Sequence, residues 1–284
     1  MVEWETKRLY QEALVEDTGS GDVTTMAIGA EERVSRAEII AKQEGILSGV
    51  DSAVDIFGLV DPEISVRANF KEADKLGRGD IVLEIEGRIS SILTGERTVL
   101  NFLAHLSGVA TMTSQFVQMI AHTRARITDT RKTTPLLRHL EKKAVRAGGG
   151  VNHRMGLYDM ILLKENHIAA AGGILSAVNL AREFKAARAP NVKIEVETRS
   201  LAEVREAVSC QVDRIMLDNM DTATMRKAVA LINGKAEIEA SGGVTMHTVR
   251  EIAETGVDLI SVGALTHSAP AFDFSLLIKG DSNG

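Results

Sequence analysis

Short apolar runs and amphipathic segments alternate through the second half of the chain. The β-rich runs are ARITDT (125–130), MILLKEN (160–166), KIEVET (193–198), RIMLDN (214–219), AEIEASGG (236–243) and LISVGA (259–264). Helical patterns separate them: LLRHLEKKAVRA, ILSAVNLAREFKAA, LAEVREAVS, ATMRKAVALI and TVREIAETG. This alternation predicts parallel strands joined by right-handed crossovers. Six such units in about 140 residues favour a barrel or partial barrel over an open sheet.

The first half has a different pattern. A charged helical segment runs from about Glu3 to Glu16 and is ended by the turn residues of EDTGSGDVTT. Alternating segments follow, which predict a mixed or antiparallel sheet: RAEIIAKQEGILSG, ISVRANF and DIVLEIEG. The stretch 96–123 has apolar residues at three- and four-residue steps, so it predicts one or two helices, with a break at Gly108.

Composition places the chain among soluble globular proteins. It has 284 residues, of which 44% are hydrophobic and 25% charged, and no apolar run approaches the roughly 20 residues of a membrane span. A lone Cys210 excludes an internal disulfide and indicates a reducing compartment. The N-terminal pattern is helical and charged rather than that of a signal peptide. We therefore expect a cytoplasmic protein.

Charge is unevenly distributed. The net charge is −6, which argues against nonspecific nucleic-acid binding, yet residues 122–167 hold ten Lys and Arg against four Asp and Glu. That segment is +6, so the remainder carries −12. A solvated basic helix accounts for Arg138, Lys142, Lys143 and Arg146. Four other cations lie at strand ends or in glycine-rich turns: Arg131, Lys132, Arg154 and Lys164. They indicate an anion site.

Polar residues end each predicted strand. They are Asp129 to Lys132, Lys164 to Asn166, Glu197, Asp218 and Asn219, Ser241 to Gly243, and Gly263 with Ala264. Strands often end on polar residues at a surface, which explains any one of these. Because the βα loops of a barrel converge on one rim, however, the set predicts an active site with acids, cations and glycine-rich turns.

Each residue type has its own chemistry. Arg131 offers a planar fork and Lys132 a compact charge to carboxylate or phosphate. Lys164, at the end of an apolar run, fits an anion-binding group, a Schiff-base lysine, or an ion pair with Glu165 or Glu197. Carboxylates such as Glu197 can hold ribose hydroxyls, bind water on Mg²⁺, or face a developing cation. Glycine-rich turns bring main-chain N–H groups to phosphate.

Taken together, the chain resembles the quinolinate phosphoribosyltransferase (nicotinate-nucleotide pyrophosphorylase) family. The matching segments occur in family order and span nearly the whole chain. They are EDTGSGDVTT, GERTVLNFLAHLSGVAT, TRKTTP, EKKAVRAGGGVNHRMGLYDMILLKENHI, IEVET, IMLDN, IEASGGV and SVGALTHSAPAFDFSL.

The resemblance implies an α/β fold of two domains. An N-terminal α/β sandwich would cover 1–105, with 271–284 returning to it, and an open (partial) α/β barrel of parallel strands would cover 106–270. It also implies a homodimer, or a hexamer of such dimers, in which Arg97 of one subunit completes the neighbour's site. Nucleic acid and membrane are not expected partners.

The resemblance also assigns roles. Arg131, His153, Arg154 and Lys164 would hold the two quinolinate carboxylates, and Lys132 would lie near the ring and the pyrophosphate. Glu197 and Asp218 would face the ribose and Mg²⁺, the expected cofactor. The 5-phosphate would be cradled by Ser241, Gly242, Gly243, Val262, Gly263 and Ala264. Thr130 of TRKTTP completes the substrate-binding set, and the catalytic groups would be Lys132, Lys164, Glu197 and Asp218.

The implied reaction transfers phosphoribosyl from 5-phosphoribosyl 1-pyrophosphate to quinolinate with decarboxylation. It gives nicotinate mononucleotide, CO₂ and pyrophosphate in NAD biosynthesis. Three alternatives stay open: a paralogous enzyme of molybdenum-transport loci with a different anionic substrate, a Schiff-base barrel aldolase using Lys164, and a non-catalytic anion sensor. The intact KENH sequence argues against the paralogue.

Three positions depart from the family pattern. Leu136 stands where the family usually has Gly, Glu165 where it has Asp, and Gln211 where a helix-ending Gly is common. The first two would alter the rim of the pocket slightly. The third concerns a helix cap and would cost about 1 kcal/mol of stability.

Overall fold

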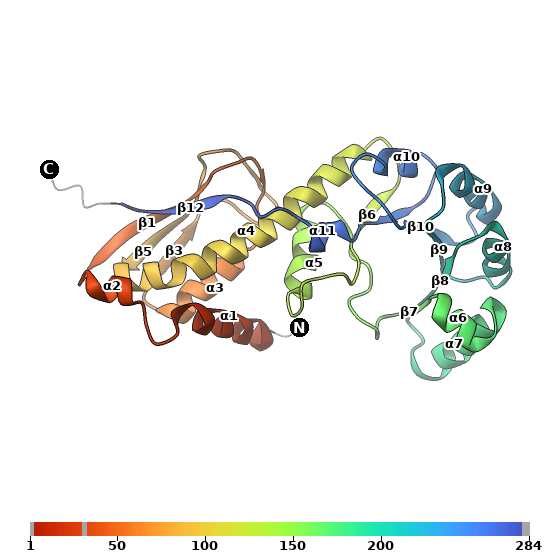
Figure 1. The fold of residues 1–284 in the computed structure, drawn as a ribbon, viewed down its shortest axis with the longest axis horizontal. Coiled ribbons are helices and arrows are strands. Elements are labelled where there is room, and N and C mark those ends of the chain that lie inside the picture. Colours follow the sequence, from red (N-terminus) through yellow and green to blue (C-terminus); the bar gives the residue numbers. More distant parts are fainter. Residues whose placement is uncertain (1–2, 30–32, 280–284) are drawn as a thin grey trace. The chain divides into compact units, whose positions relative to one another are not determined.

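The computed structural model describes residues 3–29 and 33–279, shown as a ribbon in Figure 1. The chain divides into two compact units. The first comprises the described parts of Met1–Met112, Pro135–Gly148 and Ala269–Gly284, and the second comprises Thr113–Thr134 and Gly149–Ser268. Each unit is thus built from segments that are not continuous in the sequence.

A four-stranded antiparallel sheet forms the framework of the first unit. Its strands, in the order β12-β1-β5-β3, are β12 (Phe274–Lys279), β1 (Val34–Ala41), β5 (Ile81–Arg88) and β3 (Ser65–Ala68). Ala37, Ile39 and Ala41 of β1 are buried, as expected where one face of a sheet packs on a core. The pair β2 (Gly45–Ile46) and β4 (Lys75–Leu76) is also antiparallel. The predicted antiparallel strands are therefore confirmed, and β12 brings the C-terminal segment back to this sheet.

Helices supply the rest of the first unit's core. They are α1 (Glu3–Thr18), α2 (Val23–Ala27), α3 (Val50–Val60), α5 (Arg138–Ala147) and much of α4 (Ile89–Met119). The buried Tyr10 of α1 donates a hydrogen bond to Ser52 of α3 at 2.7 Å, and its ring meets Phe102 of α4 edge-on at 5.1 Å. A buried tyrosine needs such a partner for its hydroxyl, so this contact fixes how α1 packs.

The predicted helix break at Gly108 is wrong, because α4 is continuous over 31 residues. A Cβ built on Gly108 would lie 2.2 Å from the carbonyl oxygen of Pro270. Glycine is therefore present because another segment of the same unit passes close to the helix, and not because the helix ends there. Neither α4 nor any other helix among the described residues is long and apolar enough to cross a membrane.

One segment groups differently from the predicted domain ranges. Residues 135–148, which contain α5, belong to the first unit and not with the barrel strands on either side of them. The buried Glu141 lies 2.8 Å from Nε2 of His105, and Lys143 pairs with Asp51. These contacts within the first unit account for the grouping, and nothing in the hydrophobic pattern of the segment indicates them.

The second unit contains a six-stranded parallel sheet. Its strands, in spatial order, are β6 (Arg126–Thr128), β11 (Leu259–Ser261), β10 (Glu237–Ser241), β9 (Arg214–Asp218), β8 (Lys193–Thr198) and β7 (Met160–Leu163). Helices connect β7 to β11 in turn: α6 (Glu165–Ala171), α7 (Ile174–Arg188), α8 (Leu201–Ser209), α9 (Thr222–Ile232) and α10 (Val249–Ala253). The short α11 (Ala264–His267) follows β11. All six predicted strands are present.

The sheet is an open barrel. β6 and β7 are its end strands, and each pairs with a single neighbour in the described chain, apart from a bridge between Thr128 and Val151. The central strands are buried almost throughout, including all of β8 after Lys193, which suits a parallel sheet covered on both faces. Figure 1 shows β7 to β10 following one another, with α6 to α9 along one side. The predicted partial α/β barrel is confirmed.

Two departures from the family pattern lie where the backbone is left-handed. Leu136 has φ of 66° and Gln211 has φ of 51°. Left-handed backbone is the conformation that glycine adopts without steric strain. Both substitutions for glycine thus place an L side chain in a strained conformation.

Candidate active site

A cavity of about 820 Å³ opens at the C-terminal ends of the parallel strands, entirely within the second unit. Residues from the C-terminal ends of the six strands, or from the loops after them, line it. The predicted residues among them are Thr130, Arg131, Lys132, His153, Arg154, Lys164, Glu197, Asp218, Ser241, Gly242, Gly243, Gly263 and Ala264. The expectation that polar strand ends meet at one rim is therefore correct for this unit.

Asp129 joins two of the loops that carry cations. It is fully buried after β6, and its carboxylate accepts the N–H of His153 at 2.9 Å and the side-chain amide of Asn152 at 2.5 Å. The loop with Arg131 is thereby held against the loop with Arg154. A buried carboxylate is tolerated here because hydrogen bonds satisfy it.

The two arginines are close enough to affect each other. Burial lowers the pKa of the Arg154 guanidinium, and the positive charge of Arg131 lowers it further. Arg154 is anchored by a hydrogen bond of 3.2 Å from Nη1 to the carbonyl oxygen of Met160. Crowded cations of this kind favour an anion between them, since that anion relieves their repulsion.

His153 lies at the base of the cavity with a side chain only 6% exposed. Nε2 is 3.2 Å from Glu195 and 3.3 Å from Glu239, while Nδ1 accepts the N–H of Arg154 at 2.7 Å. Burial lowers the pKa of His153, whereas the two carboxylates raise it; the proton that they favour is the one on Nε2, so Nδ1 keeps its lone pair for the Arg154 N–H. The pKa of Glu195 is raised by burial and by the charge of Glu239.

Glu197 and Asp218 face one cation. Arg199 places Nη2 at 3.7 Å from Glu197 and Nε at 3.5 Å from Asp218, and its Nη1 bonds Glu165. The two carboxylates, 9% and 15% exposed, thus converge on a shared position that suits a positive group. Hard carboxylate oxygens are also what Mg²⁺ prefers, so the same two groups would hold that ion where it displaces the guanidinium of Arg199.

Lys164 is not buried, although its place at the end of an apolar run suggested burial. Its side chain is 51% exposed and lies 3.8 Å from Glu197. Its main-chain N–H donates to Nδ1 of His167 at the start of α6. Half-exposure removes the burial argument for a Schiff-base nucleophile, and the contact with Glu197 is the ion pair that the sequence left open; anion binding by Lys164 stays a prediction.

Glycine is required by geometry in the turn after β10. Gly242 has φ of 96° and Gly243 has φ of 60°, and a Cβ on Gly242 would lie 2.2 Å from Oδ1 of Asn219. After β11, a Cβ on Gly263 would lie 3.1 Å from Cδ of Lys132. Both turns therefore bring bare main chain to the cavity, and Lys132 lies over the second one.

One residue predicted to line this cavity does not do so, and Arg97 was expected only in the site of a neighbouring subunit. Val262 is buried, and its N–H donates to the carbonyl oxygen of Thr128 at 2.9 Å, so the β11 turn contributes only Gly263 and Ala264. Arg97 is an exposed residue of α4 in the first unit.

Other lining residues were not predicted. They are Leu157, Leu162, His167, Met216, Glu239, Val244, Thr245, Ser261 and His267. The sequence carried a signal for one of them, Glu239. Glu237 and Glu239 alternate with apolar residues in a strand, so both acids project from the same face of the sheet. The apolar members carry no signal, since Leu162 and Met216 read as ordinary core residues.

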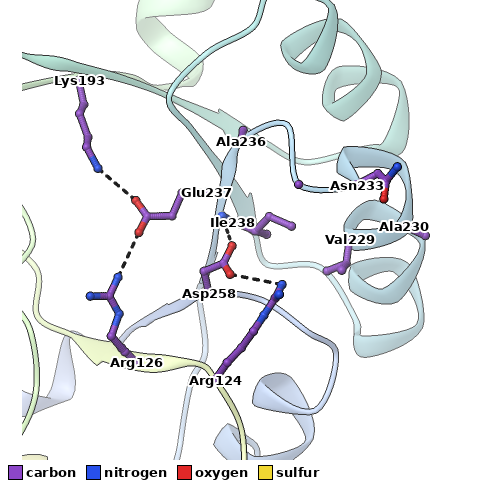
Figure 2. Close-up of a pocket in the computed structure, with 11 residues that line it drawn as sticks. Arg124, Arg126, Lys193, Val229, Ala230, Asn233, Ala236, Glu237, Ile238 and Asp258 are labelled. Carbon is purple, nitrogen blue, oxygen red and sulfur yellow. Dashed lines mark hydrogen bonds and ion pairs between the residues drawn. The ribbon is translucent and has the colours of Figure 1, made fainter.

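A second cavity, of about 830 Å³, opens where the same strands begin. Figure 2 shows its charged groups paired with one another: Arg126 and Lys193 both reach Glu237, and Arg124 reaches Asp258. These cations are already paired with carboxylates of the unit. The second cavity therefore has less positive charge available to bind an anionic substrate than the first one has.

Comparison with known proteins agrees with this geometry. Residues 22–107 match the family described as Quinolinate phosphoribosyl transferase, N-terminal domain, and residues 109–277 match its C-terminal domain. The chain is 43% identical over 270 residues to the probable nicotinate-nucleotide pyrophosphorylase (carboxylating) of Bacillus subtilis, covering 95% of this chain and 92% of that one. Identity to the Synechocystis protein of the same name is 46% over 272 residues, covering 94% and 90%.

A solved structure agrees over nearly the whole chain. The nicotinate-nucleotide pyrophosphorylase from Francisella tularensis superimposes with a TM-score of 0.94 at 40% identity and covers 98% of both chains. With both family domains matched in order and close relatives matched over almost their full length, the chain belongs to the quinolinate phosphoribosyltransferase family.

Proposed function

We propose that the chain transfers phosphoribosyl from 5-phosphoribosyl 1-pyrophosphate to quinolinate and releases CO₂, pyrophosphate and nicotinate mononucleotide. One observation carries the proposal: a single cavity holds Arg131, Lys132, Arg154 and Lys164 together with the acids Glu197 and Asp218. Both substrates are polyanions, and bringing them into contact is unfavourable unless fixed cations compensate their charge.

Quinolinate would bind on the side of the cavity formed by the loops after β6 and β7. Arg131 and Arg154 offer planar forks to its carboxylates, Lys164 a third positive charge, and His153 the base of the pocket. We further propose that the enzyme is a homodimer in which Arg97 of the partner subunit closes this pocket. Its exposure on α4 leaves Arg97 available for such a contact.

The phosphoribosyl donor would bind on the opposite side. Its 5-phosphate would lie against the bare main chain of Ser241 to Gly243 and of Gly263 and Ala264, with Lys132 directed at the pyrophosphate. Glu197 and Asp218 would hold the ribose and the Mg²⁺ that accompanies the donor. When bound, that Mg²⁺ would supply positive charge to the departing pyrophosphate.

These residues serve each stage of the reaction. As pyrophosphate leaves, the ribose C1 gains positive character, which the carboxylates of Glu197 and Asp218 stabilise, and Lys132 stabilises the departing anion. The pyridine nitrogen then bonds to C1. The resulting pyridinium accepts the electron pair of the adjacent carbon–carboxylate bond, so CO₂ leaves and that carbon takes up a proton without an organic cofactor.

A labelled-substrate assay tests the proposal. Quinolinate labelled in its 2-carboxylate should release labelled CO₂ only when the phosphoribosyl donor and Mg²⁺ are both present. Lys164→Met should lower turnover by about 10²–10³, the usual effect of removing one well-placed charge from such a site. Absence of labelled CO₂ from the folded wild-type enzyme would refute the proposal.

The chain provides a matched control. Lys193 is 55% exposed and pairs with Glu237, much as Lys164 is 51% exposed and pairs with Glu197, but it lies at the other end of the strands. Lys193→Met should leave turnover unchanged. An equal loss in both variants would show that general charge, and not the proposed site, governs activity.

A further inference from the structure

Beneath the candidate site lies a buried group of four titratable side chains, of which the proposed reaction uses only His153 directly. His153, Glu195, Arg214 and Glu239 have side chains 6%, 0%, 9% and 0% exposed. Arg214 Nη1 is 3.0 Å from Oε2 of Glu239 and 3.6 Å from Oε2 of Glu195. The same two oxygen atoms lie 3.3 and 3.2 Å from Nε2 of His153. We call these four residues the buried quartet.

Strand register brings the quartet together. On β9, Arg214 is paired with Glu195 of β8 on one side and with Glu237 of β10 on the other. Glu239, two residues after Glu237, projects from the same face of its strand one step closer to the cavity. The arginine therefore has carboxylates around it in the interior of the sheet, where isolated charges would be very unfavourable.

The quartet does not fit a metal ion, although a histidine and two glutamates within reach of one another suggest one. The carboxylate oxygens that a metal would need already face the guanidinium of Arg214. A fixed cation at that place repels a second cation. The arrangement is therefore a set of ion pairs around Arg214 and not a metal site.

His153 is held in place at both ring nitrogens and at its main-chain N–H. Nε2 faces Glu195 and Glu239, Nδ1 accepts the N–H of Arg154, and the N–H of His153 donates to Asp129. The imidazole cannot turn without losing contacts at both nitrogens. Because the Arg154 N–H is one of those contacts, the position of that arginine depends on the same ring.

We infer that Glu195, Glu239 and Arg214 are positioning residues that fix His153 and Arg154 as the dicarboxylate-binding wall of the cavity. The inference rests on the proposed function, because it names the part of the site that holds quinolinate. Arg214 also offsets the charge of two carboxylates that would otherwise repel a dianion bound above them. The quartet thus acts on quinolinate binding and leaves donor binding unaffected.

Steady-state kinetics of Glu239→Gln tests the inference. The KM for quinolinate should rise about tenfold, as expected when a partner of a buried charge-assisted contact is removed, while the KM for the donor changes less than twofold. Glu237→Gln is the control, because Glu237 accepts from Arg214 at 2.8 Å on the side away from the cavity. It should leave both KM values unchanged.

Three outcomes would overturn the inference. A lower KM for quinolinate in Glu239→Gln would mean that this carboxylate only repels the substrate. Equal rises in both KM values would mean a general loss of the site's shape. A lower thermal midpoint with unchanged KM values would mean that the quartet serves stability alone.

A double-mutant cycle separates positioning from independent action. Combining Glu239→Gln with His153→Ala should raise the KM for quinolinate no further than the more severe single variant does, because both changes remove one contact. Multiplying effects would refute coupling. His153→Gln, which keeps a side-chain donor toward Glu239, should restore the KM to within about threefold of wild type.

Direct binding keeps the two proposals distinguishable. Calorimetric titration of quinolinate into the full-length protein requires no turnover, so it reports on the quartet even if the wild-type enzyme releases no CO₂. Loss of CO₂ release with intact, quartet-dependent quinolinate binding would refute the proposed function alone. If Glu239→Gln does not fold, Glu239→Asp and Glu195→Gln provide the same comparison.

Discussion

Replacing Gln211 by glycine should stabilise the protein. Gln211 follows the end of α8 with φ of 51°, and its N–H donates to the carbonyl oxygen of Val208 at 3.1 Å. Its own carbonyl oxygen accepts from Arg182, and its side chain is exposed. These bonds use main-chain atoms of residue 211, so glycine can keep both of them while relieving the strained conformation.

The magnitude follows from two opposing effects. An L side chain in left-handed backbone costs about 1–2 kcal/mol relative to glycine. Glycine makes the unfolded chain more flexible, which offsets about 0.4–1 kcal/mol of that gain. The net stabilisation of Gln211→Gly is therefore about 0.5–1 kcal/mol, or an increase of about 1–4 °C in the midpoint of thermal unfolding of the unit.

Urea unfolding followed by circular dichroism measures this change. The midpoint concentration should rise with an unchanged m value, and decarboxylation activity should not change. Asn233 is the matched control: it also ends a helix with left-handed backbone, at φ of 45°, but asparagine tolerates this conformation. Asn233→Gly should therefore gain little. Equal effects at both positions, or destabilisation by Gln211→Gly, would refute the argument from backbone strain.

Two further predictions concern the first unit. Gly108→Ala should lower the free energy of unfolding by about 1–3 kcal/mol, because the new Cβ would overlap the Pro270 carbonyl. Gly58→Ala should raise it by about 0.5–1 kcal/mol, because a Cβ at residue 58 meets nothing within 4 Å. Urea unfolding of the two variants measures both changes. The hydrogen bond from Ser91, then that from the Glu63 N–H and the contacts of Arg88, lower the pKa of Asp61 below its ordinary 3.8, so the stability it contributes is present above that pH and is lost as pH falls below it. Asp61→Asn should accordingly be less stable than wild type at pH 7 and lose less stability between pH 5 and 3; parallel curves for the two proteins would contradict this.

The strands and the rim of the barrel could be predicted because local pattern determines them. Apolar runs bounded by polar residues mark buried parallel strands, and the ends of such strands meet at one edge whatever the helices between them do. Lys164, Glu197 and Asp218 could therefore be placed together correctly without any knowledge of packing.

Other features depend on which segments meet, which the pattern does not contain. Gly108 resembles a helix break in sequence, but it marks close approach of Pro270. The grouping of α5 with the first unit depends on contacts of Glu141 and Lys143. The buried quartet depends on the strand register that sets Arg214 between Glu195 and Glu237. The alternating acids of β8 and β10 are visible in the sequence, but the sequence does not show that Arg214 lies beside them.

Because the parallel sheet is open, the strands that carry the site differ in how well they are protected from local unfolding. Main-chain amides of the end strands β6 and β7 have one paired neighbour and should exchange with deuterated solvent first, whereas those of β8 to β10 are enclosed on both sides. Arg131 follows one end strand and Lys164 follows the other, while Glu197, Asp218 and Ser241 belong to the enclosed strands. The groups proposed to bind the aromatic acid thus follow the less protected strands, and those proposed to bind the sugar phosphate belong to the more protected ones.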